Sequence, residues 1–173
     1  VVVTPAPFNV RSRVHEYGGG EMLTDAGTLY FSNFADNLVY AQAPQGAPRA
    51  LTSDPMQRHA DFTLDRSRRR LIAVREDHSV AGEARNSIVA LSLAGGAGVE
   101  LAAGFDFYAA PRLSPDGAQL AWLCWNHPRM PWEGSELWRA DVGRDGLLAR
   151  ARRIAGGPGE ALGQPLWSPR GDL

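Results

Sequence analysis

Short apolar runs separated by turn-forming residues recur along the whole chain, and this pattern predicts β-strands. The run Leu120–Trp125 is apolar at both alternating sets of positions, which is typical of a strand covered on both faces. The run Leu137–Val142 alternates between apolar and polar side chains, which predicts a strand with one face in water. No stretch has the periodicity of an amphipathic helix, so an all-β fold is expected.

One strand-turn-strand pattern occurs four times. Its clearest copy is Leu113–Trp122, in which the sequence Ser-Pro-Asp-Gly supplies the residues that a hairpin turn favours. Looser copies begin at Leu23, Phe62 and Trp167. Their spacing is close to the roughly 40 to 50 residues of propeller blades, with room for insertions in the longer intervals.

Each complete repeat continues with a third and a shorter fourth strand. The third strands are expected at Leu38–Ala41, Ile88–Leu93 and Leu137–Val142, and the fourth at Arg49–Thr52, Val99–Ala102 and Arg152–Ala155. We therefore predict a partial β-propeller with about three four-stranded antiparallel blades, at residues 20–53, 60–104 and 109–157. Strands of two further blades are expected at 164–173 and near Val1–Pro5.

Propellers close with about 4–8 blades, so three blades would leave open edges. We accordingly expect the 173 residues to be a fragment of a longer propeller domain. The open edges also suggest a homo-oligomer formed by pairing of edge strands.

Composition and charge exclude several classes of function. The net charge of −1 argues against a nucleic-acid partner, and no apolar run is long enough to span a membrane, so a cytoplasmic protein is expected. The one cysteine, Cys124, lies in an apolar run and is interpreted as a buried thiol. The four histidines are scattered, and no cofactor or metal site is expected. The basic cluster Arg66–Arg70 is interpreted as a solvated hairpin tip.

Four segments together resemble a known family. Arg11–Gly20, Leu113–Trp122, Trp125–Pro128 and Met130–Trp132 resemble the propeller domain of prolyl oligopeptidase family serine peptidases, closest to the acylaminoacyl-peptidase and dipeptidyl-aminopeptidase-like branch. The resemblance implies a C-terminal α/β-hydrolase domain with a Ser-Asp-His triad, for which the propeller restricts access to short peptides. The sequence contains no Gly-x-Ser-x-Gly motif, so no catalytic residue is assigned and the chain itself is expected to be inert.

The segment from His15 through Glu16 and Tyr17 into three glycines is the first candidate site. In one interpretation the glycines let the backbone approach a ligand or a neighbouring domain. Glu16 would then meet the free amino end of a peptide, as carboxylates elsewhere in the family do. In the other, the glycines make a tight connection between blades, with Tyr17 buried and Glu16 paired to Arg11 or Arg13.

The loop Trp125–Gly134 is the second candidate site, because it combines aromatic side chains with prolines. Its Trp125, His127, Met130 and Trp132 would suit a contact with another domain or the wall of a peptide pocket. The alternative is an ordered loop folded on its own blade. The corresponding insertion Glu76–Glu83 is polar and is interpreted as a solvated loop, with a position facing the partner domain as the alternative.

Three functions remain open at this point. The first is the propeller of a cytoplasmic serine peptidase that removes residues or blocked residues from the N-terminus of short peptides. The alternative is a non-enzymatic propeller that acts as a protein-interaction scaffold. A lyase or glycosidase with its site in the central channel is weaker, because no inward-facing acids or metal ligands can be identified.

Overall fold

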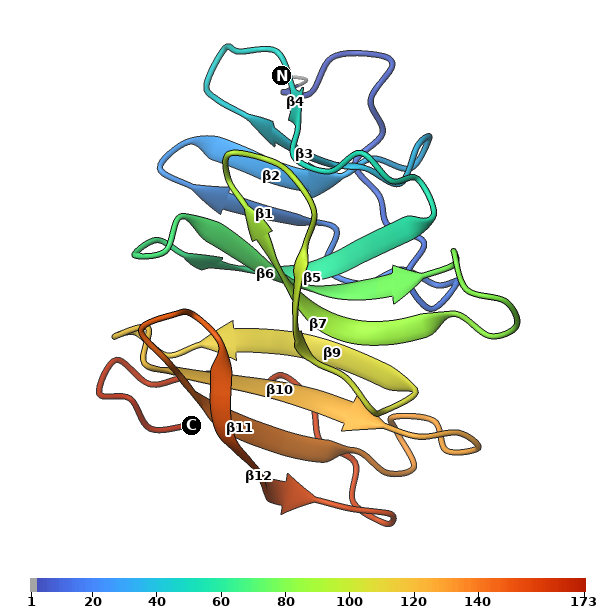
Figure 1. The fold of residues 1–173 in the computed structure, drawn as a ribbon, viewed down its shortest axis with the longest axis vertical. Coiled ribbons are helices and arrows are strands. Elements are labelled where there is room, and N and C mark those ends of the chain that lie inside the picture. Colours follow the sequence, from blue (N-terminus) through green and yellow to red (C-terminus); the bar gives the residue numbers. More distant parts are fainter. Residues whose placement is uncertain (1–2) are drawn as a thin grey trace.

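The computed structural model describes residues 3–173, and its twelve strands form three four-stranded antiparallel sheets (Figure 1). The first sheet contains β1 (Met22–Asp25), β2 (Thr28–Ser32), β3 (Val39–Gln42) and β4 (Arg49–Ala50). The second contains β5 (Gln57–Asp65), β6 (Arg70–Asp77), β7 (Arg85–Ser92) and β8 (Val99–Ala102). The third contains β9 (Phe107–Leu113), β10 (Gln119–Trp125), β11 (Glu136–Val142) and β12 (Leu148–Gly156).

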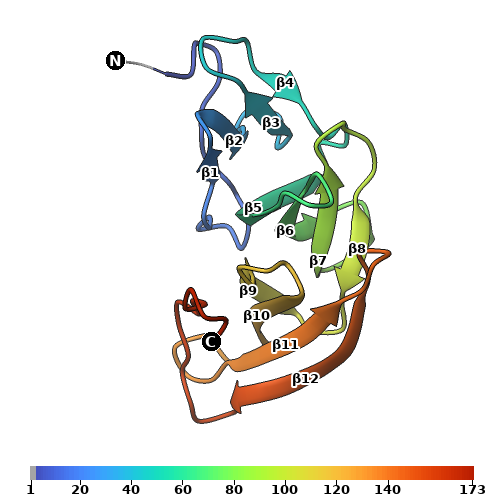
Figure 2. The ribbon, with the colours of Figure 1, turned by 90° about the vertical axis from the view of Figure 1, so that its left-hand side faces the viewer.

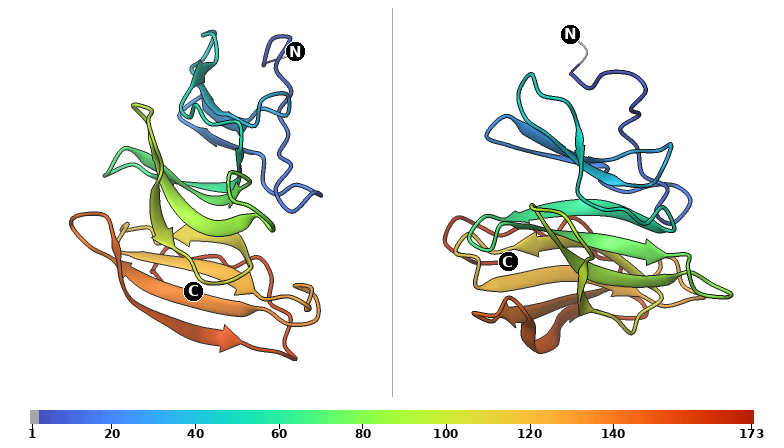
Figure 3. Two further views of the ribbon diagram at one scale, coloured as in Figure 1. Left: turned by 45° about the vertical axis from the view of Figure 1, so that its right-hand side comes forward. Right: turned by 45° about the horizontal axis from the view of Figure 1, so that its top comes forward.

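The three sheets stand side by side like the blades of a fan (Figure 2). Strands follow their sequence order within each sheet, so β1, β5 and β9 lie along one side of the fan and β4, β8 and β12 along the other. Figure 3 shows the same stack from two further directions, with β12 at the free edge of the third sheet. The prediction of an all-β partial propeller is confirmed.

Two hydrophobic cores join neighbouring blades, and strand alternation divides β6 between them. Leu71 and Ala73 belong to the core shared with the first blade, whereas Ile72 and Val74 belong to the core shared with the third. All four are fully buried because both faces of this sheet are covered. The same reason explains why Leu120–Trp125 of β10 is apolar at every position.

The segment expected to begin a further blade, 164–173, forms no strand in the structure. It nevertheless repeats a local backbone feature of β9, the first strand of the third blade. Gln164 has a φ of 52°, four residues before Ser168, just as Ala110 has a φ of 50° four residues before Ser114. A strand requires a paired neighbour, and among residues 3–173 this segment has none. Of the strand expected near Val1–Pro5, the first two residues lie outside the described part and the remaining three are not in a strand.

The interpretation of Arg66–Arg70 as a solvated tip is wrong for two of its arginines. Arg70 is only 9% exposed, and its Nη2 donates to the carbonyl oxygen of Gly146 at 2.8 Å. Arg68 reaches the carbonyl oxygens of Gly117 at 3.3 Å and Gly143 at 3.1 Å. Both guanidinium groups are anchored by Asp65, so this turn clamps the second blade to the third.

Residues 3–173 contain no helix of the length and apolar character that crossing a membrane requires.

Candidate functional site

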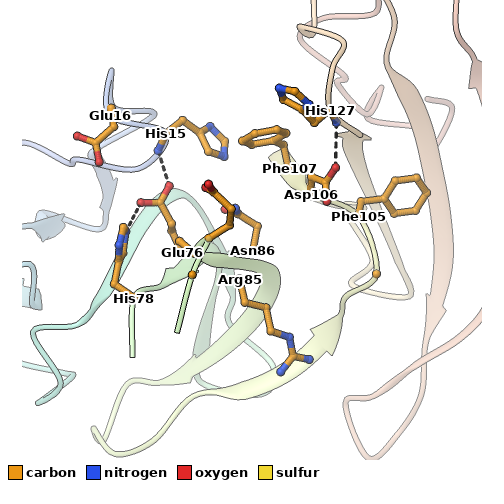
Figure 4. Close-up of a pocket in the computed structure, with 14 residues that line it drawn as sticks. His15, Glu16, Glu76, His78, Arg85, Asn86, Phe105, Asp106, Phe107 and His127 are labelled. Carbon is orange, nitrogen blue, oxygen red and sulfur yellow. Dashed lines mark hydrogen bonds and ion pairs between the residues drawn. The ribbon is translucent and has the colours of Figure 1, made fainter. Parts of the chain in front are cut away.

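A pocket of about 920 Å³ lies where the second and third blades meet, beside the segment that precedes the first blade (Figure 4). Its lining includes three histidines, four carboxylates and one arginine, together with Phe105 and Phe107. The β6–β7, β8–β9 and β10–β11 loops all contribute to it. Loops held on a rigid scaffold are the usual place for binding residues.

Strand register builds one wall of the pocket. Arg58 on β5 pairs with Glu76 on β6, and Glu76 pairs with Asn86 on β7, so the three residues form one row across the second blade. They share the face that carries Val74 and Ile88, which is the face packed against the third blade. Glu76 and Asn86 line the pocket directly.

Glu76 is the hub of this wall. Its side chain is 6% exposed, and its Oε2 accepts a hydrogen bond from the backbone N of His15 at 2.7 Å. Its Oε1 lies 3.1 Å from Arg58 Nη1 and 2.5 Å from His78 Nε2. Glu76 was placed in a solvated loop on sequence grounds, and this was wrong because it ends the buried part of β6.

The first candidate segment makes a sharp, strained bend at residues 15–18, called the elbow below, which packs against Glu76. His15 and Glu16 have φ angles of 55° and 64°, a left-handed conformation that is uncommon for residues other than glycine. Gly18 follows with a φ of 88°, where its lack of a Cβ removes the strain. Such strain persists only where surrounding contacts hold it, and here Glu76 and Arg58 do so.

The Glu16 carboxylate projects from the elbow to the mouth of the pocket. It is 79% exposed and forms an ion pair with Arg58 Nη1 at 2.5 Å, so the expected pairing with Arg11 or Arg13 is replaced. The hydrogen bond from Arg58 lowers the pKa of Glu16 below its usual range. Arg11 and Arg13 instead lie over the ring of Phe34. Tyr17, which the second interpretation buried, is 66% exposed.

The His15 ring is wedged among aromatic side chains. Its centroid lies 5.4 Å from that of Phe107 and 5.7 Å from that of Trp125, with both rings meeting it edge to face. Burial lowers the pKa of His15, while Glu76 and Asp61 act in the opposite direction. The imidazole is therefore held neutral at pH 7.

The second candidate loop divides between the pocket and the solvent. His127 lines the pocket, and its backbone N donates to Asp106 Oδ2 at 2.9 Å. Trp125 is 5% exposed and does not line the pocket, but it stacks on Phe107, which does. Met130 and Trp132 do not line the pocket. Their part of the loop closes on itself through hydrogen bonds from residues 133 and 134 to the Met130 carbonyl oxygen.

Sequence reasoning missed Asn86, Asp106 and Phe107 as well as Glu76. The alternation of β6 and β7 contained a usable signal for two of them. Glu76 has the parity of Ile72 and Val74, and Asn86 has the parity of Ile88, so both face the third blade. Polar residues at core-facing positions of otherwise apolar strands indicate a site or a polar network.

The arrangement is suited to binding rather than to covalent chemistry. No serine, cysteine or threonine is among the residues that line this pocket, so it offers no hydroxyl or thiol nucleophile. Within residues 3–173 no group of three or more His, Cys, Asp or Glu side chains is placed to hold a metal ion. Four carboxylates and one arginine line the pocket, and Arg58, which is paired with Glu16 and Glu76, offsets only part of the remaining negative charge, so the pocket favours a ligand that carries positive charge.

No protein-family model and no curated protein sequence matches this chain. Among solved structures, a puromycin hydrolase is 41% identical with a TM-score of 0.89, over 98% of this chain and 29% of the hydrolase. A mutant of puromycin hydrolase in complex with PGG matches equally well. A puromycin-hydrolyzing peptidase of Mycobacterium tuberculosis is 38% identical with a TM-score of 0.85, over 95% of this chain and 28% of that one. A nidogen/laminin complex, at 14% identity and a TM-score of 0.55, shares the fold alone.

Proposed function

We propose that this chain is the non-catalytic propeller part of a serine peptidase of the prolyl oligopeptidase family. The observation that carries the proposal is the 41% identity over 98% of the chain to a puromycin hydrolase, of which it spans 29%. The parent protein would be a cytoplasmic enzyme that removes residues from the N-terminus of short peptides, in the manner of acylaminoacyl- or dipeptidyl-peptidases. The propeller would limit access to the hydrolase domain by size.

The pocket between the second and third blades would bind the amino end of the substrate. Glu16 supports this role, because its carboxylate is exposed at the mouth while its backbone is fixed by the elbow. An α-ammonium group would compete with or join Arg58 at this carboxylate. Charge-assisted hydrogen bonds of this kind contribute about 1.5–3 kcal/mol.

The face that carries the pocket would also contact the hydrolase domain. Tyr17, Met130 and Trp132 are exposed there, at 66%, 36% and 68%. In Figure 1 the β6–β7 loop, the β10–β11 loop and the segment before β1 all project from one side of the stack. Exposed aromatic side chains gathered on one face are typical of an interaction surface.

The test is to express the complete open reading frame and assay it with puromycin and chromogenic aminoacyl substrates. We expect a Gly-x-Ser-x-Gly motif downstream, followed by Asp and His, and hydrolysis by the complete protein. The 173-residue chain alone should give no turnover. A complete protein without a hydrolase domain would refute the proposal and favour an interaction scaffold.

The role of Glu16 is tested in the complete enzyme with Glu16→Gln. We expect a rise in KM of about tenfold or more, with a smaller effect on kcat, because a charge-assisted contact to the substrate is lost. Glu160→Gln removes the same charge from an exposed position outside the pocket and should leave KM unchanged. Equal kinetics for the two variants would exclude Glu16 from substrate binding.

A further inference from the structure

One polar side chain in the pocket wall is left without a partner. In the row Arg58–Glu76–Asn86, Arg58 donates to three oxygens and Glu76 accepts from three donors. Asn86 is 6% exposed, and its buried Oδ1 has no hydrogen-bond partner of good geometry among the described residues. A buried acceptor left unsatisfied costs about 1–3 kcal/mol, so such an atom in a pocket wall requires an explanation.

The His15 imidazole lies beside this amide, and one of its ring nitrogens could donate the hydrogen bond that the amide oxygen lacks. Its buried Nε2 also lacks a partner of good geometry, and Asn86 acts on the ring as a hydrogen-bonding neighbour. The elbow and the ring are held in place because the backbone N of His15 is bonded to Glu76 and the imidazole packs edge to face with Phe107 and Trp125. Figure 4 shows His15 and Asn86 on the same side of the pocket.

A hydrogen bond between these two neighbouring atoms would set the tautomer of the ring. A neutral imidazole has one N–H and one lone pair, and an amide oxygen at Nε2 selects the form in which Nε2 carries the hydrogen. Nδ1 then becomes an acceptor and is the ring nitrogen left for a ligand. The charged groups that act on the ring are Glu76 from β6 and Asp61 from β5, and burial outweighs both.

We propose that Asn86 and His15 form a second, uncharged binding element of this pocket, in which Asn86 fixes the tautomer and His15 Nδ1 accepts a hydrogen bond from an N–H group of a peptide ligand. This inference rests on the proposed function for its substrate class. It separates two tasks in one pocket, because Glu16 attracts charge at the mouth and His15 recognises a neutral donor deeper inside. Asn86 is thus a positioning residue that acts through His15.

The tautomer is measured first, by long-range ¹H–¹⁵N correlation spectra of the histidines in the 173-residue chain, without any assay of activity. We expect His15 in the Nε2–H form in the native protein and a mixture of tautomers in Asn86→Ala. Asn86→Asp keeps the shape but adds a negative charge, which should raise the pKa of His15 and convert Nδ1 from acceptor to donor near neutral pH. His78, which is paired with Glu76, serves as the internal control.

Binding is measured next, by titrating triglycine into the same labelled chain. Saturation should shift the ¹⁵N resonance of His15 Nδ1, and Asn86→Ala should weaken binding about tenfold, as expected for one hydrogen bond. Binding of triglycine without a shift at Nδ1, or a native His15 in the Nδ1–H form, would overturn the inference and leave the proposed function intact. A complete protein without peptidase activity would refute the proposed function, whereas the tautomer and the shift would still stand.

Discussion

Replacing Asp65 with alanine tests whether a buried charge network holds the second blade against the third. The Asp65 side chain is 1% exposed, and its Oδ2 lies 2.9 Å from Arg70 Nε and 3.1 Å from Arg68 Nη1. Burial raises the pKa of this carboxyl, but hydrogen bonds from Ser67, Arg70 and Arg68 outweigh burial and hold the pKa below its usual value. Asp65 is therefore ionised in the native protein, and its stabilisation is present at neutral pH and lost on acidification.

The magnitude follows from what the substitution leaves behind. Asp65→Ala leaves the Arg70 guanidinium, at 11% exposure, without its counter-charge. Removing one partner of a buried ion pair costs about 3–5 kcal/mol. Asp116 is a matched control in the corresponding turn of the third blade, where it bonds only Ser114 Oγ and the N of Ala118. Asp116→Ala should cost about 1 kcal/mol.

The assay is urea unfolding at pH 7, followed by tryptophan fluorescence, with hydrogen exchange to locate the change. Exchange should accelerate in the β9–β10 turn and in the β11–β12 turn, whose carbonyl oxygens the two arginines bind. The double variant Asp65→Ala/Arg70→Met removes the orphaned charge and should recover most of the loss. If Asp65→Ala lowers the free energy of unfolding no more than Asp116→Ala does, the network of Asp65, Arg68 and Arg70, called the clamp below, does not hold the two blades together.

Three further outcomes follow from burial. Burial lowers the pKa of His59 to about 3, so the neutral ring stabilises the fold above about pH 6.5 and this contribution is lost as the pH falls toward 3. His59→Leu should reduce the pH dependence of the unfolding free energy over that range by about one proton, and an unchanged slope in urea titrations would contradict this. Cys124 is fully buried, and burial raises the pKa of its thiol, so aromatic disulfide reagents should react only after unfolding; rapid labelling of the native chain would count against this. Trp132→Ala should change the stability of this chain by less than about 0.5 kcal/mol, because the side chain is 68% exposed, yet weaken docking of the hydrolase domain in the complete protein.

The fold could be predicted because the turns and the alternation are local signals. The Ser-Pro-Asp-Gly turn and its looser copies predicted the positions of the hairpins. Continuous apolar runs indicated β6 and β10 as strands that are covered on both faces. The segment 164–173 shows the limit of this reasoning. Its turn and the left-handed Gln164 repeat the local pattern, but a strand also needs a neighbour, and local sequence cannot supply one.

The site was predicted only in part because it joins residues that are far apart in sequence. His15, Glu16 and His127 were candidates and line one pocket, but the residue that organises the elbow, Glu76, is 61 positions away from His15. Local reasoning paired Glu16 with its neighbours Arg11 and Arg13. The actual partner, Arg58, is brought there by the register of β5 against β6.

The clamp and the pocket act at opposite ends of the same interface between the second and third blades. The Asp65 network lies at the β5–β6 turn, whereas the pocket lies at the β6–β7 loop, on the other side of the stack in Figure 1. Asp65→Ala should therefore lower stability without changing a side chain of the pocket. A ligand that binds only the native pocket would still stabilise this variant by mass action, in proportion to the logarithm of its concentration. Equal ligand-induced stabilisation of native and Asp65→Ala protein would show that the pocket is formed by the loops and elbow themselves, independently of the clamp.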